Sequence, residues 1–158
     1  MKKLRSILCL IGNYLPPKLN SCFYKLAGVK FNISKVWIGN KCYLDVPFPE
    51  YITIEDNVCI TSRVTIISHF DPSVGIKNHP IKKYKKRVLL KEGVFVGPGS
   101  IIMPGVVIKK NTFIQAGTVV TKSTNENSIV SGNPQKEKKK LTLNIVSKIN
   151  TQNKKFKY

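Results

Sequence analysis

Apolar side chains recur every six residues through the middle of the chain. Aliphatic residues stand at Leu90, Val96, Ile102, Ile108, Ile114 and Val120, and a small or β-branched residue stands two positions before each of them. Turn formers such as Pro98-Gly99 separate the repeats. Neither the 3.6-residue period of an α-helix nor a hairpin array gives this spacing, whereas short strands wound into a solenoid do. The pattern predicts a parallel β-helix whose aliphatic side chains point inward.

The same register occurs earlier, at Ile38, Leu44, Ile54, Ile60 and Ile66. The stretch "DVPFPEY" interrupts it as a small insertion. A longer segment between Ile66 and Leu90 contains "SHFDP" and the basic cluster "KKYKKR". This composition favours a loop that leaves the solenoid over residues 68–87, because polar and turn-forming residues replace the inward aliphatic positions.

The first 27 residues show a helical pattern instead. Ile7, Leu8, Leu10 and Ile11 can share one side of a short helix that ends near Pro16. The apolar run is shorter than the roughly 20 residues of a membrane span, and no small-x-small cleavage site follows it. We expect this helix to pack on the rest of the protein, with a basic amphipathic helix on a membrane surface as the alternative.

These patterns divide the chain into three parts. They are an N-terminal helical segment (1–27), a β-helix (28–134) and a basic C-terminal extension (135–158). A chain of 158 residues is long enough to bury one core. The expected fold class is therefore all-β: a hexapeptide-repeat solenoid with a short N-terminal helix, one long excursion loop and a basic C-terminal tail.

The chain is strongly basic, with 27 Lys and Arg residues against 8 Asp and Glu residues, for a formal charge of +19. Such a charge attracts anions: nucleic acid, an acidic membrane surface, an anionic cofactor or an anionic glycan all fit it. The cysteines Cys9, Cys22, Cys42 and Cys59 show no CxxC spacing and sit among apolar neighbours. We expect buried thiols and a reducing, cytoplasmic location, with peripheral contact to the inner face of the membrane as an option.

Three sequence pieces occur in a characteristic order: "YITIEDNVCITSRVTIISHFDP", "GVFVGPGSIIMPGVVIKKNTFIQAGTVVTK" and "IVSGNP". From about residue 28 to 136 the chain thereby resembles the hexapeptide-repeat acyltransferases. The similarity is greatest to the branch of sugar and polysaccharide O-acetyltransferases that includes maltose and galactoside acetyltransferases. The resemblance implies a left-handed β-helix, a homotrimer with active sites in the clefts between subunits, and acetyl-CoA as the donor. It implies an O-acetyltransferase for a sugar or glycan precursor, for example in capsule, exopolysaccharide or lipopolysaccharide synthesis.

In this family the histidine that follows the coil before the long loop is the general base, and "SHFDP" places His69 there. Imidazole is suited to this role because it exchanges protons near neutral pH. We expect Asp71 or a main-chain carbonyl to orient the other ring nitrogen. Asp45 is a candidate contact for the acceptor hydroxyl, and the alternative is a turn residue that bonds its own backbone.

The resemblance also assigns positions along the coenzyme A groove. In chain order these are Phe95 at an aromatic position, Pro98 and Ala116 beside the pantetheine arm, Thr121 and Lys122 in the turn near the nucleotide, and Lys136 after the "GNP" motif. Lysines at these positions can form charge-assisted hydrogen bonds with the phosphates of CoA.

Three other functions fit part of the sequence. Zinc carbonic anhydrases use the same solenoid but need three histidine ligands, whereas this chain has only His69 and His79, so no metal is expected. A non-enzymatic binder of nucleic acid or of a membrane fits the charge, although the sequence contains no recognised nucleic-acid motif and nucleic acid is not expected. An acetyltransferase for a non-sugar acceptor such as serine is the remaining alternative, but the long helical N-terminal domain usual in serine acetyltransferases does not appear.

Overall fold

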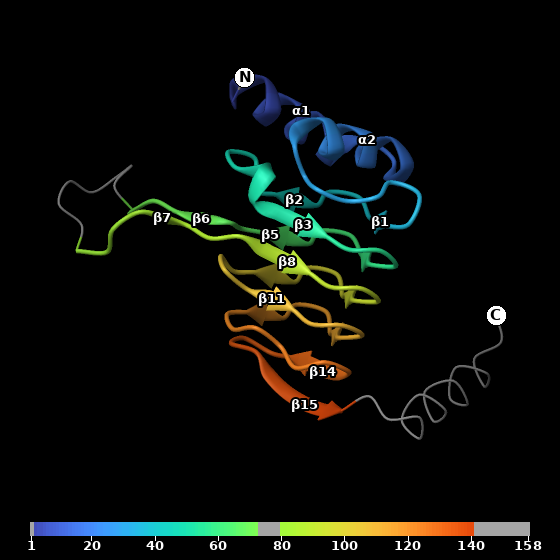
Figure 1. Ribbon diagram of the computed structural model, residues 1–158, viewed down its shortest axis with the longest axis vertical. Coiled ribbons are helices and arrows are strands. Elements are labelled where there is room, and N and C mark those ends of the chain that lie inside the picture. The colour runs from blue at the N-terminus through green and yellow to red at the C-terminus, as the bar shows by residue number, and fades with distance from the viewer. Residues whose placement is uncertain (1, 73–79, 141–158) are drawn as a thin grey trace.

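The computed structural model describes residues 2–72 and 80–140. Two helices, α1 (Lys2–Tyr14) and α2 (Pro17–Ala27), come first in the chain. The first coil contains β1 (Trp37–Ile38), β2 (Tyr43–Leu44), the short 3-10 helix η1 (Pro49–Tyr51) and β3 (Ile52–Ile54). The coils stack along the long axis of the molecule, and the helices cover one end (Figure 1).

The remaining strands follow in chain order. They are β4 (Cys59–Ile60), β5 (Thr65–Ile66), β6 (His69–Phe70), β7 (Tyr84–Lys85), β8 (Val88–Leu90), β9 (Phe95–Val96), β10 (Ile101–Ile102), β11 (Val107–Ile108), β12 (Phe113–Ile114), β13 (Val119–Val120), β14 (Ser128–Ser131) and β15 (Lys136–Lys140). Most have two residues, as expected when a turn follows every hexad.

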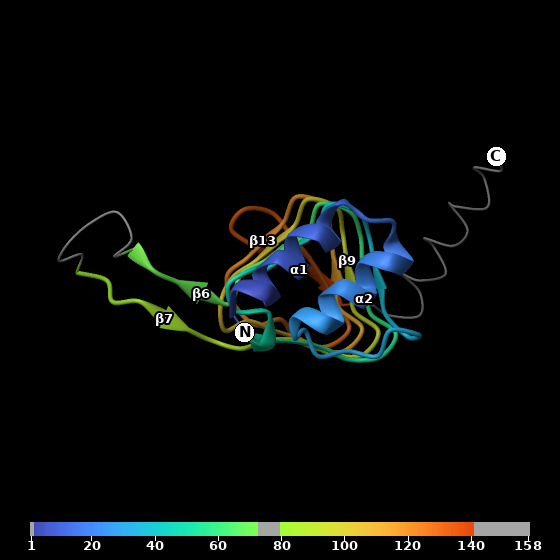
Figure 2. The ribbon, with the colours of Figure 1, turned by 90° about the horizontal axis from the view of Figure 1, so that it is seen from above.

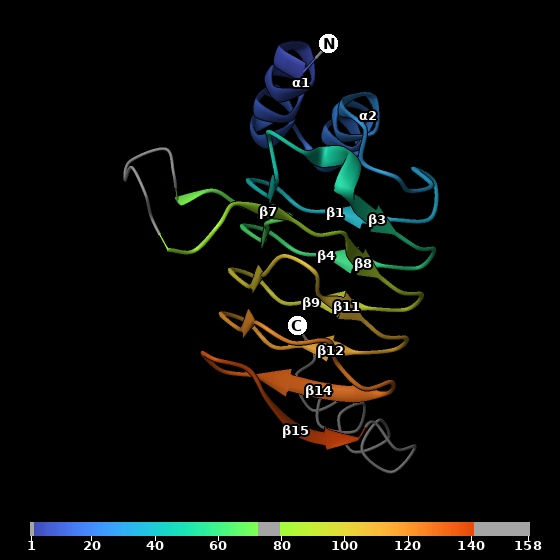
Figure 3. The same cartoon turned by 60° about the vertical axis from the view of Figure 1, so that its left-hand side comes forward.

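Three parallel sheets form the three faces of the solenoid. The first face has the order β1-β4-β9-β12-β14, the second β2-β5-β10-β13 and the third β3-β8-β11. The inward residues are in register from coil to coil, so that Ile60 pairs with Ile38 on one side and with Val96 on the other. The predicted parallel β-helix is confirmed, and Figure 3 shows the coils one above another.

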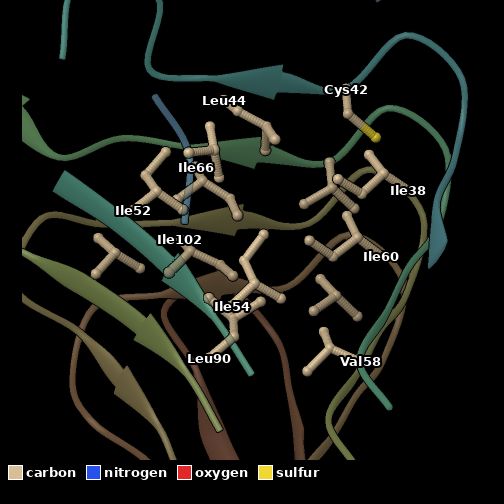
Figure 4. Close-up of a cluster of buried hydrophobic side chains, with 14 of the residues drawn as sticks. Ile38, Cys42, Leu44, Ile52, Ile54, Val58, Ile60, Ile66, Leu90 and Ile102 are labelled. Atoms are coloured by element: carbon tan, nitrogen blue, oxygen red, sulfur yellow. The ribbon is translucent and has the colours of Figure 1, made fainter. Parts of the chain in front are cut away.

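The core is a column of stacked aliphatic side chains. Ile38, Leu44, Ile60, Ile66 and Ile102 are fully buried, and the close-up in Figure 4 shows them directed into the shared interior. Full burial of one such side chain contributes on the order of 1.5–3 kcal/mol. The column therefore gives the site a rigid support.

The corners of the solenoid require either a left-handed backbone conformation or a close approach between the backbones of neighbouring coils. Glycine meets the first need at Gly117 (φ 68°), and asparagine replaces it at Asn111 and Asn127 (φ 53° and 52°). Gly97 meets the second need, because a Cβ there would lie 2.6 Å from the backbone nitrogen of Ala116 in the next coil. Some hexads can thus lack the usual glycine without losing the corner.

The N-terminal segment contains two helices where the apolar pattern predicted one. The phenol of Tyr24 donates a hydrogen bond to the carbonyl of Cys42 at 2.6 Å, and the Asn20 amide donates to the carbonyls of Ile38 and Gly39. These bonds fix α2 on the first coil, and both helices lie across the end of the solenoid in Figure 2. The second helix starts at Pro17, since proline is favourable at the first helical position.

The predicted excursion loop forms a two-stranded antiparallel ribbon. β6 pairs with β7, His69 opposite Lys85 and Phe70 opposite Tyr84. The ribbon leaves the solenoid after β5, rejoins it at β8, and projects sideways in Figures 1 and 2. The loop is thus partly ordered into strands, because backbone pairing across its stem satisfies the hydrogen bonds that a coil would otherwise provide.

The other end of the solenoid closes with β15, which pairs antiparallel with β14. Within residues 136–140 the basic extension is therefore a strand, and the rest of the expected tail (141–158) lies outside the described residues. In the described parts of the chain no helix is long and apolar enough to cross a membrane.

Candidate active site

His69 and Asp45 form the centre of the candidate site. Nδ1 of His69 lies 2.9 Å from each carboxylate oxygen of Asp45. The Asp45 side chain is fully buried, and that of His69 is 25% exposed. Because a carboxylate only accepts, the imidazole donates through Nδ1–H, which leaves the lone pair on Nε2 for proton transfer.

Ser68 holds this carboxylate from a second side. Its backbone N–H donates to Oδ2 of Asp45 at 2.6 Å, and its hydroxyl donates to the same oxygen. The Ser68 hydroxyl also lies 3.2 Å from the carbonyl oxygen of Phe48. Since Ser68 is fully buried, these bonds are shielded from competing water.

The structure corrects two expectations. The partner of the second imidazole nitrogen is Asp45, where we expected Asp71 or a main-chain carbonyl, because β2 and β5 pair in register (Leu44 with Ile66) and bring the following residues to one corner. For the same reason Asp45 faces His69 and Ser68 and has no exposed surface for an acceptor hydroxyl. Asp71 instead lines the cavity beside His69.

This cavity has a volume of about 410 Å3. Its walls combine the histidine with aromatic and basic side chains: Phe48, His69, Phe70, Asp71, Lys83, Tyr84 and Lys85. The Phe48 ring meets the His69 ring edge-on at 5.0 Å, and the Lys85 ammonium lies 3.7 Å from the centre of Phe48. Aromatic rings beside a cation suit a ligand with both an apolar ring face and polar or anionic groups.

The positions assigned to the pantetheine arm lie on the first face and its adjoining corner. Phe95 is half-buried and stacks on Phe113 of the next coil, with ring centres 4.7 Å apart and planes 6° from parallel. Pro98 and Ala116 are exposed at the corner that follows, where the carbonyl of Pro98 accepts a hydrogen bond from the N–H of Gly117. The structure therefore brings Phe95, Pro98 and Ala116 to one edge.

The positions assigned to the nucleotide meet at another edge. The backbone N–H groups of Thr121 and Lys122 both donate to the side-chain carbonyl of Gln135, at 2.8 and 3.2 Å. Gln135 directly precedes Lys136, which is exposed at the start of β15. Thr121 and Lys122 follow β13, just as His69 follows β5. They therefore lie at the same corner of the solenoid as His69, two strands away along the second face.

Sequence reasoning did not identify Ser68, Phe113 or Gln135. Ser68 was detectable as a small polar residue directly before the histidine, and Gln135 as the neighbour of Lys136, but neither carries a recognised motif. Among the described residues no group of His, Cys, Asp and Glu side chains could hold a metal ion. His79 lies outside the described residues.

The expectation of buried thiols holds for Cys9 and Cys42, whereas Cys59 is half-buried and Cys22 is exposed on α2. Burial, with smaller contributions from Asp45 and Glu50, raises the pKa of Cys9 to about 12, and burial raises that of Cys42 to about 11. The thiol of Cys9 contacts the carbonyl of Leu44 in the first coil. A protonated, buried thiol is a poor nucleophile.

Comparison with known proteins agrees with this geometry. Residues 87–122 match the bacterial transferase hexapeptide family (six repeats). The chain is 41% identical over 115 residues to the protein CapG of Staphylococcus aureus, an alignment that covers 67% of this chain and 66% of CapG. This chain therefore spans slightly less than two thirds of that relative.

Two solved structures share the fold. A point mutant of AntD, an N-acyltransferase from Bacillus cereus in complex with dTDP and coenzyme A, is 26% identical, with a TM-score of 0.59 over 77% of this chain and 69% of AntD. A maltose O-acetyltransferase from Clostridium difficile 630 is 21% identical, with a TM-score of 0.67 over 89% of this chain and 86% of that one. The expected left-handed β-helix is confirmed. Residues 87–122 of this chain therefore carry the repeat of the hexapeptide-repeat transferase family.

Proposed function

We propose that this protein transfers an acetyl group from acetyl-CoA to a hydroxyl group of a sugar or glycan precursor, with His69 as the general base. The observation that carries the proposal is the buried Asp45 carboxylate 2.9 Å from Nδ1 of a histidine that lines a cavity of about 410 Å3. An imidazole held in one tautomer beside a solvent-accessible cavity is the arrangement that hydroxyl activation needs.

The proposed reaction is a direct attack. The acceptor hydroxyl oxygen bonds to the thioester carbonyl carbon while Nε2 of His69 takes the hydroxyl proton. The tetrahedral intermediate then collapses, the carbon–sulfur bond breaks, and the imidazolium returns the proton to the CoA thiolate. The Asp45 carboxylate stabilises the transient imidazolium and holds its orientation throughout.

The residues on the lower coils fit acetyl-CoA as the donor. The edge with Pro98 and Ala116 is exposed and free of charged side chains at these two positions, as a neutral pantetheine arm requires. Lys122 and Lys136 are exposed near Gln135, where ammonium groups can bind the phosphates of the nucleotide. The CoA bound to AntD, a protein of the same fold, supports this choice of donor.

The cavity supports a sugar as the acceptor. Aromatic rings such as Tyr84 and Phe48 pack against the apolar face of a sugar ring, and Lys83 can bind an anionic substituent. Such an acceptor fits the synthesis of a capsule, an exopolysaccharide or a lipopolysaccharide. AntD transfers to nitrogen and was solved with dTDP, so the acceptors to be tested include amino sugars and nucleotide-linked sugars.

The test follows CoA release with a thiol reagent while acceptors are scanned, and mass spectrometry identifies the acetylated product. We expect His69→Ala to lower kcat by about 10²-fold or more, since general-base assistance contributes typically 10²–10⁴-fold. His69→Gln provides a polar control of similar length that cannot act as a base. Turnover unchanged in both variants would exclude His69 as the base.

We further propose that the active form is a homotrimer with sites between neighbouring subunits. The support is an outer face that displays large apolar side chains, Trp37 at 50% and Phe113 at 37% exposure, which a neighbouring subunit would bury. Light scattering on the purified protein should give a mass of about three times 17.8 kDa. A monomeric, fully active enzyme would contradict this assembly.

A further inference from the structure

The two N-terminal helices together expose an apolar surface at the end of the solenoid. On α1 the exposed side chains are Leu4, Ile7, Leu10, Ile11 and Tyr14, and on α2 they are Leu19, Cys22 and Leu26. Exposure reaches 62% at Leu4, 68% at Leu26 and 84% at Tyr14. We refer to these eight residues as the apolar cap. Contiguous apolar surface of this kind marks an interaction site on a soluble protein.

Contacts of α1 show that its part of the apolar cap faces away from the solenoid. Cys9 contacts the carbonyl of Leu44 in the first coil, and Gly12 faces α2 beside Phe23. At 100° per residue, Ile7 and Ile11 lie about 160° around the helix from Cys9. These two side chains therefore point outward from the end of the molecule.

The same holds for α2. The Tyr24 hydroxyl bonds to the first coil, and Cys22 and Leu26 lie about 160° around the helix from it. Figures 1 and 2 show α1 and α2 side by side across the end of the solenoid. The exposed rows of the two helices thus form one surface that faces outward.

The positive charge of residues 1–27 favours an anionic partner for the apolar cap. Residues 1–27 contain five cationic residues and no acidic residue. Lys18 is exposed on α2, whereas the ammonium of Lys25 donates a hydrogen bond to the carbonyl of Phe31. A second copy of the chain would bring the same positive charges to the contact and repel it, whereas an anionic lipid surface both attracts the charges and accepts the apolar side chains. We propose that the apolar cap docks on an anionic lipid bilayer, with the helices lying in its interface and the solenoid axis pointing away from it.

Vesicle co-sedimentation of the full-length protein tests this proposal. The probes are phosphatidylcholine vesicles with and without about one quarter phosphatidylglycerol, at about 100 mM and about 500 mM NaCl. We expect strong binding to the anionic vesicles that weakens at high salt. The double variant Ile7→Ser/Ile11→Ser should lower the partition coefficient about tenfold or more, because it removes apolar contact and keeps every charge.

Ile33→Ser provides the matched control, since Ile33 is 42% exposed against 43% for Ile11 but lies on the turn before β1, outside the apolar cap. It should bind vesicles as the wild type does, and circular dichroism should show all variants folded. Equal vesicle binding of wild type and double variant would overturn the proposal, because the basic residues alone would then account for binding. A smaller particle mass of the double variant in light scattering would assign the apolar cap to contact between copies instead.

This inference does not depend on the proposed acetyl transfer. The double variant leaves His69, Asp45 and the cavity unchanged, so its turnover of a soluble acceptor should equal that of the wild type. The double variant should lose vesicle binding and keep its turnover, whereas His69→Ala should lose turnover and keep vesicle binding. These two results separate the two proposals.

Discussion

The hydroxyl of Ser68 donates a hydrogen bond to Oδ2 of Asp45, the carboxylate that also contacts Nδ1 of His69. Ser68 and His69 in one coil thus both contact the same buried oxygen of Asp45 in the neighbouring coil. Ser68→Ala should lower kcat by about threefold to tenfold, because only one of the two hydrogen bonds from Ser68 to the carboxylate is lost and the backbone N–H bond remains. The KM for acetyl-CoA should stay constant, and steady-state kinetics checks both values. A rise in KM without loss of kcat would contradict a positioning role.

Asp45 and Asp71 should differ in their effect on turnover. Asp45→Asn keeps the size of the side chain but removes the negative charge that holds the Nδ1 proton, so kcat should fall about 10²-fold or more. Asp71→Asn should change kcat by less than about tenfold, because Asp71 lines the cavity and Asp45 already occupies the orienting position. The reverse order in kcat would restore Asp71 as the orienting residue.

Substitution of the lysines near Gln135 should change only the KM for acetyl-CoA. Lys122→Ala and Lys136→Ala should each raise the KM for acetyl-CoA about fivefold to tenfold, as expected for the loss of one phosphate contact of about 1 kcal/mol. A donor without the 3′-phosphate should show a smaller effect of at least one of these substitutions. Lys110→Ala is the control, because Lys110 pairs with Glu92 on the outside of the solenoid.

Gly97 should tolerate a side chain less well than Gly117. A Cβ at Gly97 would meet backbone atoms at 2.6–2.7 Å, so Gly97→Ala must displace the neighbouring coil and should cost more than about 2 kcal/mol. Gly117→Ala has open space and faces only the strain of φ 68°, which costs about 1–2 kcal/mol. Denaturant unfolding measures both, and a smaller loss for Gly97→Ala than for Gly117→Ala would contradict the close approach.

Thiol reactivity should follow burial. At pH 8 a thiol reagent should modify the exposed Cys22 first, while Cys9 and Cys42, with pKa values raised to about 12 and about 11, should react only on unfolding. In the unfolded chain these thiols lose their protons above the ordinary pKa of 9.0, whereas the buried thiols stay protonated to higher pH. Their contribution to the free energy of unfolding is therefore fully present below pH 9 and declines as the pH rises. Rapid modification of all four cysteines in the native state would contradict this burial.

The fold was predictable because its signal is repeated. Each inward aliphatic position, such as Ile102 or Ile114, supports the same period, so one substitution does not hide it. The position of His69 was predictable from its place after the last regular hexad. The partner of His69 was not, because the contact with Asp45 depends on the register between β2 and β5, which only the folded stack defines. The pattern does not predict the second helix, because the prolines that end the first helix also include Pro17, the residue that begins α2.

The ribbon of β6 and β7 leaves the solenoid at Ile66 and returns at Val88, at points where the flanking strands remain fully paired. The stack therefore keeps its strand pairing on both sides of the point where the ribbon leaves it. Insertions and deletions in the ribbon beyond Phe70 can alter the wall beside His69 while the contact between His69 and Asp45 stays in place. If the proposed acetyl transfer is correct, the choice of acceptor can in this way change among related proteins that keep the His69–Asp45 pair.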